Sequence, residues 1–185
     1  DQKSHDLWNR MPNHPDFLDI RVGVGEVEMP CTISYPKEKL SLIDDPLRNE
    51  PERLKNTYGT VKDAPVSVSL RTENVIGILG STQAALFAQG IVVQIAAMHS
   101  YHDVKIAVLT DEGNATQWAW TRWLPHVFSN EDRDLRMVGS NADAIHDIVA
   151  HLDEVVTIRK GSDDNEKKDK DDETNNESYL PHYVV

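Results

Sequence analysis

The stretch from Asn74 to Asp111 constrains the fold of this chain more than any other. An apolar β-branched run, Val75 to Leu79, leads through glycines into a long apolar segment, and a second apolar run follows at Lys105 to Leu109. A strand, a glycine turn, a helix from Thr82 to Met98 and a second strand make a βαβ unit. We therefore predict an α/β fold with a parallel sheet.

The predicted helix is apolar on nearly every side. Twelve of the residues between Thr82 and Met98 are apolar, and the segment carries no charge. A helix of this kind is normally buried on most faces, as a crossover helix of a parallel sheet would be. We expect this helix to be central to the domain.

A strand that turns through glycine into a helix is also the frame of a phosphate-binding loop. The N–H groups at the helix start, with the helix dipole, favour an anion near Gly77, Gly80, Ser81 and Thr82. A nucleoside-triphosphate loop further needs a lysine and a magnesium-binding hydroxyl. Gln83–Ala85 occupies the corresponding place, so the loop lacks both groups.

The sequence resembles the first cytoplasmic, ATPase-like domain of the FtsK/SpoIIIE-type coupling proteins of type VII secretion, known as EssC and EccC. The motifs that carry this resemblance are the G-I-L-G turn, Q-x-A-x-x-H-S at Gln94–Ser100, D-V-K-I from Asp103 and W-x-R-W-L-P-H at Trp120–His126. The segments Arg10–Val27 and Asp63–Leu70 extend it over most of the chain.

This resemblance implies a RecA/P-loop-like parallel sheet with flanking helices and an N-terminal β-hairpin addition. It also implies a degenerate FtsK-like ATPase domain at 16–160 and a returning strand of the same domain at 179–185. The polar composition of the remaining segments predicts a linker or a docking strap at 1–15 and an acidic disordered loop at 161–178. The returning strand would lead toward the magnesium-binding acid of the family, so we expect the chain to be a fragment or a domain cut late in its fold.

The resemblance also implies partners and a location. The parent would be a hexameric membrane protein that exports small helical-hairpin substrates, and this module would be a cytoplasmic domain that contacts other domains of its own chain and other secretion subunits. The net charge of −12 argues against a nucleic-acid surface. The single Cys31 fits a reducing compartment, and the longest apolar run is too short to span a membrane.

The N-terminal third is expected to be peripheral. Trp8 is the one large apolar residue of the polar first segment, where it either folds back onto the domain or anchors a neighbouring segment. The alternation from Phe17 to Tyr35, with Gly23 and Gly25 at the reversal, predicts a β-hairpin or a bulged pair of strands. A surface helix between Asp44 and Gly59 and a half-buried strand at Ala64–Leu70 should follow.

Three tryptophans, Trp118, Trp120 and Trp123, lie on a predicted short helix that Pro125 ends. Their indoles either pack against the sheet or form a docking face together with His126, which we also consider a hydrogen-bonded structural histidine. Asp111 ends its strand in the manner of a magnesium-binding acid, but its place in the chain favours a solvated strand end or a helix cap.

The C-terminal third should add a second βα repeat. Arg136–Gly139 is a predicted strand and Ala142–Val156 a predicted helix. The histidine pairs, His146 with His151 and His99 with His102, lack the spacing and companion ligands of a metal site. We expect no metal and no catalytic residue.

Three functions remain open after this reading. The first is a non-hydrolysing, ATPase-like interaction module of a secretion motor. The second is a module that binds ATP or ADP through Gly77, Gly80, Ser81 and Thr82 without hydrolysing it. The third is a flavodoxin-like or Rossmann-like domain for a small ligand, although the G-x-G-x-x-G signature is missing.

Overall fold

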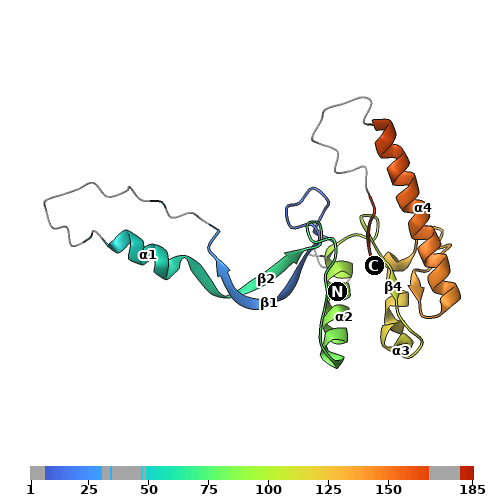
Figure 1. Ribbon diagram of the computed structural model, residues 1–185, viewed down its shortest axis with the longest axis horizontal. Coiled ribbons are helices and arrows are strands. Elements are labelled where there is room, and N and C mark those ends of the chain that lie inside the picture. The colour runs from blue at the N-terminus through green and yellow to red at the C-terminus, as the bar shows by residue number, and fades with distance from the viewer. Residues whose placement is uncertain (1–6, 31–33, 35–46, 48, 167–179) are drawn as a thin grey trace. The chain divides into compact units, whose positions relative to one another are not determined.

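The computed structural model describes residues 7–30, 34, 47, 49–166 and 180–185, and these form a mixed α/β structure (Figure 1). The chain divides into two units. The larger combines Asp1–Asp19 with Ser69–Val185, and the smaller is Ile20–Val68. None of the described helices is both long enough and apolar enough to cross a lipid bilayer.

Parallel strands form the centre of the larger unit. Strands β3 (Val104–Ile106) and β4 (Val108–Leu109) follow each other directly, so they act as one strand interrupted at Ala107. β6 (His182–Val184) pairs with β3, and β5 (Val138–Gly139) pairs with β4, both in parallel. The predicted parallel α/β class is therefore confirmed, and the RecA-like arrangement stays a prediction.

Helix α2 spans Thr82–Met98, the bounds that the sequence predicts. The predicted burial on most faces is wrong, because Ile95 is the one fully buried residue of this helix, while Leu86 is 60% and Val93 51% exposed. Apolar composition alone does not say how many neighbours a helix has. Here the strands contact one side of α2, and the opposite side has no covering layer among the described residues.

The strand predicted at Val75–Leu79 does not form. These residues belong to no strand, with Val75 89% and Leu79 98% exposed. A β-branched run becomes a strand only when a neighbouring strand satisfies its backbone groups, and no described strand lies beside it. The predicted central βαβ unit therefore lacks its first strand.

The segment after β4 consists of short turns. Helix α3 (Ala115–Trp118) continues into a 3-10 helix, η1 (Ala119–Trp123), and Pro125 begins a second one, η2 (Pro125–Val127). The predicted short helix that ends before Pro125 is thus present, although its second half has 3-10 geometry. The predicted strand at Arg136–Gly139 is shorter, with β5 limited to Val138–Gly139.

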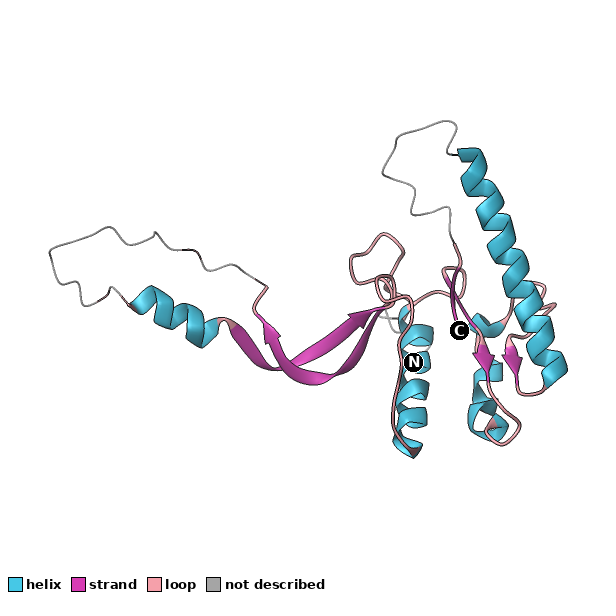
Figure 2. Ribbon diagram, in the orientation of Figure 1, coloured by secondary structure: helices cyan, strands magenta, loops and turns pink. Residues whose placement is uncertain are grey.

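Helix α4 runs from Ala142 to Glu166 and packs on the sheet on the side opposite α2 (Figure 2). Its buried Ile148 joins Ala107 and Met137 in a core cluster, with Leu152 and Tyr183 packed against it. The helix continues ten residues beyond the predicted end at Val156, so residues 161–166 are helical and not part of a loop. Once formed, a helix extends at little cost per residue. The rest of the predicted acidic loop, 167–178, lies outside the described residues.

The smaller unit consists mainly of a two-stranded ribbon and a helix. β1 (Asp19–Glu28) is a continuous strand that pairs with β2 (Thr60–Ser69), so the predicted hairpin within Phe17–Tyr35 is wrong. Gly25 does not reverse the chain. A Cβ at this position would lie 3.1 Å from Val66 Cγ2, so the glycine permits close strand contact.

The helix predicted between Asp44 and Gly59 is present as α1 (Glu50–Tyr58). Its predicted start at Asp44 lies outside the described residues. Pro51 occupies its first turn, and Arg53 pairs with Glu50 at 2.7 Å. No residue of α1 is buried, which agrees with the predicted surface position.

Truncation of Ile148 tests the core between α4 and the sheet. Ile148→Ala should lower the free energy of unfolding by about 2–5 kcal/mol, because it leaves a cavity against Ala107 and Met137. The neighbouring Val149 is 48% exposed, so Val149→Ala should change it by about 0.5 kcal/mol or less. Urea titration measures both variants, and equal losses would contradict this packing.

Candidate functional site

The four residues predicted to hold a nucleotide lie on the segment that enters α2. Gly77 is in the extended run, and a Cβ there would meet nothing within 4 Å. Gly80 has a φ of +159°, and its Cβ would lie 3.2 Å from that of Ala84. Ser81 is the N-cap without a side-chain capping hydrogen bond, and Thr82 begins the helix. The structure thus brings Gly80, Ser81 and Thr82 to an exposed helix start.

The groups that phosphate chemistry requires are not found at this turn. Gln83, Ala84 and Ala85 follow Thr82, so the first turn of α2 carries no lysine. Among the described residues, no group of three or more histidines, cysteines or acids could hold a metal ion. The groups that this turn itself offers to an anion are backbone N–H groups, the hydroxyls of Ser81 and Thr82 and the exposed amide of Gln83.

Asp111, at the end of β4, is engaged locally. Its carboxylate accepts hydrogen bonds from the backbone N–H of Asn114 at 3.0 Å and from the side-chain amide of Asn114 at 2.8 Å. The side-chain hydrogen bond from Asn114, followed by the backbone one, lowers the pKa of Asp111. The residue shapes the turn that leads into α3, which fits the predicted role at a strand end.

An apolar groove of about 260 Å³ lies between α2 and the strands. Ala88, Ile91, Val92 and Ile95 line it from the helix, and Ile106 to Leu109 line it from the sheet. Ile78, Trp118 and the last two valines complete the lining, which contains no charged side chain. Such a surface suits apolar contact and offers nothing to neutralise a phosphate.

The three residues predicted to form a docking face have different environments. Trp123 is 79% exposed, and the guanidinium of Arg122 lies 5.5 Å from its ring centroid. Trp120 is half-buried and His126 is 1% exposed. Thr121 stabilises the turn, since its hydroxyl donates to the Trp118 carbonyl at 2.7 Å. Trp123 is therefore the residue of this run that is available for contact.

Trp8 folds back onto the domain, one of its two predicted roles. Its backbone N–H donates to Ala97 O at 3.0 Å, and its indole N–H donates to Ala96 O at 3.1 Å. The indole also meets the rings of Tyr101 and His126 edge to face. We call residues 7–18, which cross the end of α2 in this way, the strap.

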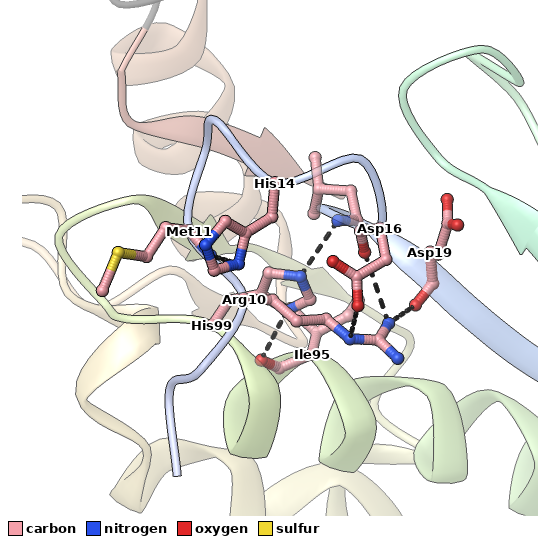
Figure 3. Close-up of polar contacts among 8 residues, drawn as sticks. Arg10, Met11, His14, Asp16, Asp19, Ile95 and His99 are labelled. Atoms are coloured by element: carbon pink, nitrogen blue, oxygen red, sulfur yellow. Dashed lines mark hydrogen bonds and ion pairs between the residues drawn. The ribbon is translucent and has the colours of Figure 1, made fainter. Parts of the chain in front are cut away.

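Arg10 holds the strap in its loop (Figure 3). Its guanidinium pairs with the Asp16 carboxylate at 3.1 Å and donates to the carbonyls of Asp16 and Asp19. Phe17, which follows, is fully buried against His99 and His182. Residues of the strap thus contribute to the core at the end of α2.

A buried pair of histidines, His99 and His126, connects the strap to the tryptophan-bearing turn, which comprises α3, η1 and η2. Leu18 N–H donates to His99 Nε2 at 3.0 Å, and His99 Nδ1 lies 3.1 Å from Ile95 O (Figure 3). His126 Nε2 lies 2.8 Å from the His99 carbonyl. Sequence reasoning missed the role of His99, and its one signal was the position of His99 directly after the apolar helix.

Hydrogen bonds fix His99 in the neutral form, and burial favours the neutral form of His126. Because Leu18 N–H is a donor, His99 Nε2 carries no proton, and its Nδ1–H donates to Ile95. His126 donates through Nε2, and its Nδ1 is buried with no partner among the described residues. Burial is the main cause that lowers the pKa of each ring below its ordinary value.

The sequence is similar to that of several type VII secretion proteins. It is 32% identical over 123 residues to the ESX secretion system protein EccC of Geobacillus thermodenitrificans, a match covering 65% of this chain and 8% of the relative. It is 32% identical over 130 residues to the ESX secretion system protein EccC of Thermomonospora curvata, a match covering 69% of this chain and 10% of the relative. The type VII secretion system protein EssC of Staphylococcus aureus is 28% identical over 126 residues, covering 68% and 8%.

The chain thus matches a tenth or less of the length of these relatives. No family model matches it.

Replacing two tryptophans one at a time separates the packed from the available indole. Trp8→Ala should lower the free energy of unfolding by about 2–3 kcal/mol, since it removes a hydrogen bond and two ring contacts. Trp123→Ala should change it by about 0.5 kcal/mol or less, as for other exposed positions. Urea titration gives both values, and a large loss for Trp123→Ala would place that indole in the core.

Proposed function

Because this chain is of the EccC/EssC type, we propose that it is a non-hydrolysing, ATPase-like module of a membrane-bound type VII secretion motor. In this role it couples the motor to the membrane, regulates it or helps to assemble it. The module acts through contacts, and hydrolysis takes place elsewhere in the parent protein.

The first turn of α2 carries this proposal. Phosphoryl transfer needs a positive charge and a metal ion at the outer phosphates, because negative charge spreads there in the transition state. The sequence Gly80-Ser81-Thr82-Gln83-Ala84 supplies neither a lysine nor an acid. Asp111, which follows β4, is engaged by Asn114 through its carboxylate.

Trp123 is the residue that we assign to contact with the rest of the machine. Tryptophan and arginine are among the residues that most often dominate the energy of protein interfaces. Trp123 extends from a turn that Pro125 and the Thr121 hydrogen bond make rigid, so little entropy is lost when it is covered. The surfaces that cover it belong to other domains of the parent chain or to other subunits of the secretion machine.

The rest of the assignment follows from the family. The parent would be a hexamer in the cell membrane that exports small helical-hairpin proteins, with this module as one of its cytoplasmic domains. The acidic net charge is unsuited to a nucleic-acid partner. We assign no cofactor and no membrane contact to this module.

A second candidate is the binding of ATP or ADP without hydrolysis. The observation that favours it is the exposed helix start, where Ser81 makes no side-chain capping hydrogen bond and Gly80 lets the backbone approach closely. Backbone N–H groups with the helix dipole can hold a phosphate weakly. Gly77, Gly80, Ser81 and Thr82 would be the binding residues.

Hydrolysis and binding are tested on the same purified chain. We expect no ATP turnover and, for an interaction module, no heat when millimolar ATP or ADP with magnesium is titrated by calorimetry. Heat that disappears in Gly80→Ala but persists in Gly90→Ala, a position within α2 where a Cβ meets nothing within 4 Å, would establish the second candidate. Turnover that is lost in Gly80→Ala would contradict both.

The contact role of Trp123 is tested in the cell. In the parent gene, Trp123→Ala should lower secretion of type VII substrates several-fold while the level of the parent protein stays unchanged, because an exposed indole contributes little to folding. Val149→Ala, at an exposed apolar position of α4, is the matched control. Normal secretion by the Trp123 variant would reject this residue as a docking anchor.

A further inference from the structure

We propose that His99 and His126 form a proton-sensitive latch, which holds the strap against the end of α2 while both rings are neutral and releases it when they take up protons. The strap comprises residues 7–18. It ends directly before β1, so its release would also free the start of that strand. The proposal rests on four hydrogen bonds and one ring contact of the larger unit.

The bond from Leu18 to His99 is the part of the latch that a proton breaks directly. His99 Nε2 accepts the Leu18 N–H at 3.0 Å, and His99 Nδ1 is committed to Ile95 O. A proton on Nε2 would place two N–H donors face to face. Since the ring is 1% exposed, water cannot relieve this contact without movement of the strap.

His126 adds a second proton-sensitive group beneath Trp8. Its Nε2–H donates to the His99 carbonyl, and its buried Nδ1 has no partner among the described residues. A proton on Nδ1 would be a buried charge without an acceptor, which is among the costliest states for a side chain. The Trp8 ring lies 6.4 Å from that of His126, so opening the strap on this side would let water reach the imidazole.

The charged groups around the two rings mostly oppose protonation. Arg10 on the strap disfavours a charge on His99, as does His126 itself, while Asp16 partly offsets them. Lys105 on β3 disfavours a charge on His126. Among the described contacts, no carboxylate of the strap forms a direct ion pair with His99. A protonated His99 would therefore not be held in place, and the strap would be released.

Backbone geometry favours release once the hydrogen bond is lost. Leu18 has a φ of +62° and Trp8 a φ of +57°, both in the left-handed region that bulky side chains avoid. Leu18 is held there from both sides, because its N–H donates to His99 and its carbonyl accepts from Leu70 N–H at 3.0 Å. Without the first bond, one restraint on this strained residue is gone.

The latch gives the strap a definite response to acid. Burial makes the pKa of both rings lower in the closed state than in the open state, so the closed strap is most stable above the ordinary histidine pKa of about 6.5 and loses stability as the pH falls below it. If opening takes up one proton, the equilibrium constant for opening rises about tenfold for each pH unit by which the pH falls in this window. If it takes up two protons, the constant rises about a hundredfold.

Hydrogen exchange measured by NMR between pH 7.5 and 5 tests the latch on the chain as it stands. The protection factors of the Leu18 amide and the Trp8 indole N–H should fall by about tenfold or more per pH unit below 6.5. The protection factors of the Ala107 and Val108 amides, which donate to Val184 O and Met137 O within the sheet, should stay unchanged. Protection of Leu18 and Trp8 that stays constant to pH 5 would overturn the proposal.

Variants assign the effect to the two rings. His99→Gln and His126→Gln cannot titrate in this range, and the amide keeps an acceptor or a donor near the same place. Each should remove part of the pH dependence, and the double variant should remove most of it, because His182, whose ring contacts Phe17 of the strap, still titrates. His146→Gln on the exposed face of α4 should keep the pH dependence in full. A double variant that opens with the wild-type dependence would reject these histidines.

Direct titration covers the case in which a variant does not fold. In the wild-type chain, the His99 and His126 ring signals should titrate below pH 6.5 and in step with the loss of Leu18 protection. Rings that become protonated while Leu18 and Trp8 remain protected would equally overturn the latch.

Discussion

The larger unit depends on the way in which the chain satisfies one buried N–H group, that of Leu18. A buried backbone donor needs an acceptor, and the one that it has is the Nε2 of His99, 81 residues away in the sequence. His99 can accept this bond because its other nitrogen donates to Ile95, in the last turn of α2. The strap, the helix end and the tryptophan-bearing turn meet at this imidazole, which gives the residue after the apolar helix a structural task.

The helix could be predicted to the residue, whereas its surroundings could not. Apolar composition, the polar Ser81 before it and the histidine after it define Thr82–Met98 locally. The Val75–Leu79 run has an equally strong local signal and forms no strand, because strand formation depends on a neighbour that the sequence does not identify. For the same reason the sequence does not identify the partner of β1. That partner is β2, which follows the segment that contains α1.

The candidate site shows the same division between local and distant information. The missing lysine at Gln83–Ala85 could be read directly from the sequence, as could the local engagement of Asp111 at a strand end. The exposure of Trp123 could not, because a 3-10 turn rotates successive side chains differently from an α-helix. The position of His99 directly after the apolar helix does not reveal its role, since its partner is set by the tertiary fold.

These features support the proposal that the module works by contact. The buried imidazoles of His99 and His126 are neutral and bonded to backbone groups, so they position segments and are not free to transfer protons to a substrate. The groove beside α2 is apolar, and the exposed indole of Trp123 is suited to covering by another protein surface. A fold that uses its polar groups to hold its own chain in place, and leaves apolar groups available, fits the proposed role in contacts with neighbouring surfaces.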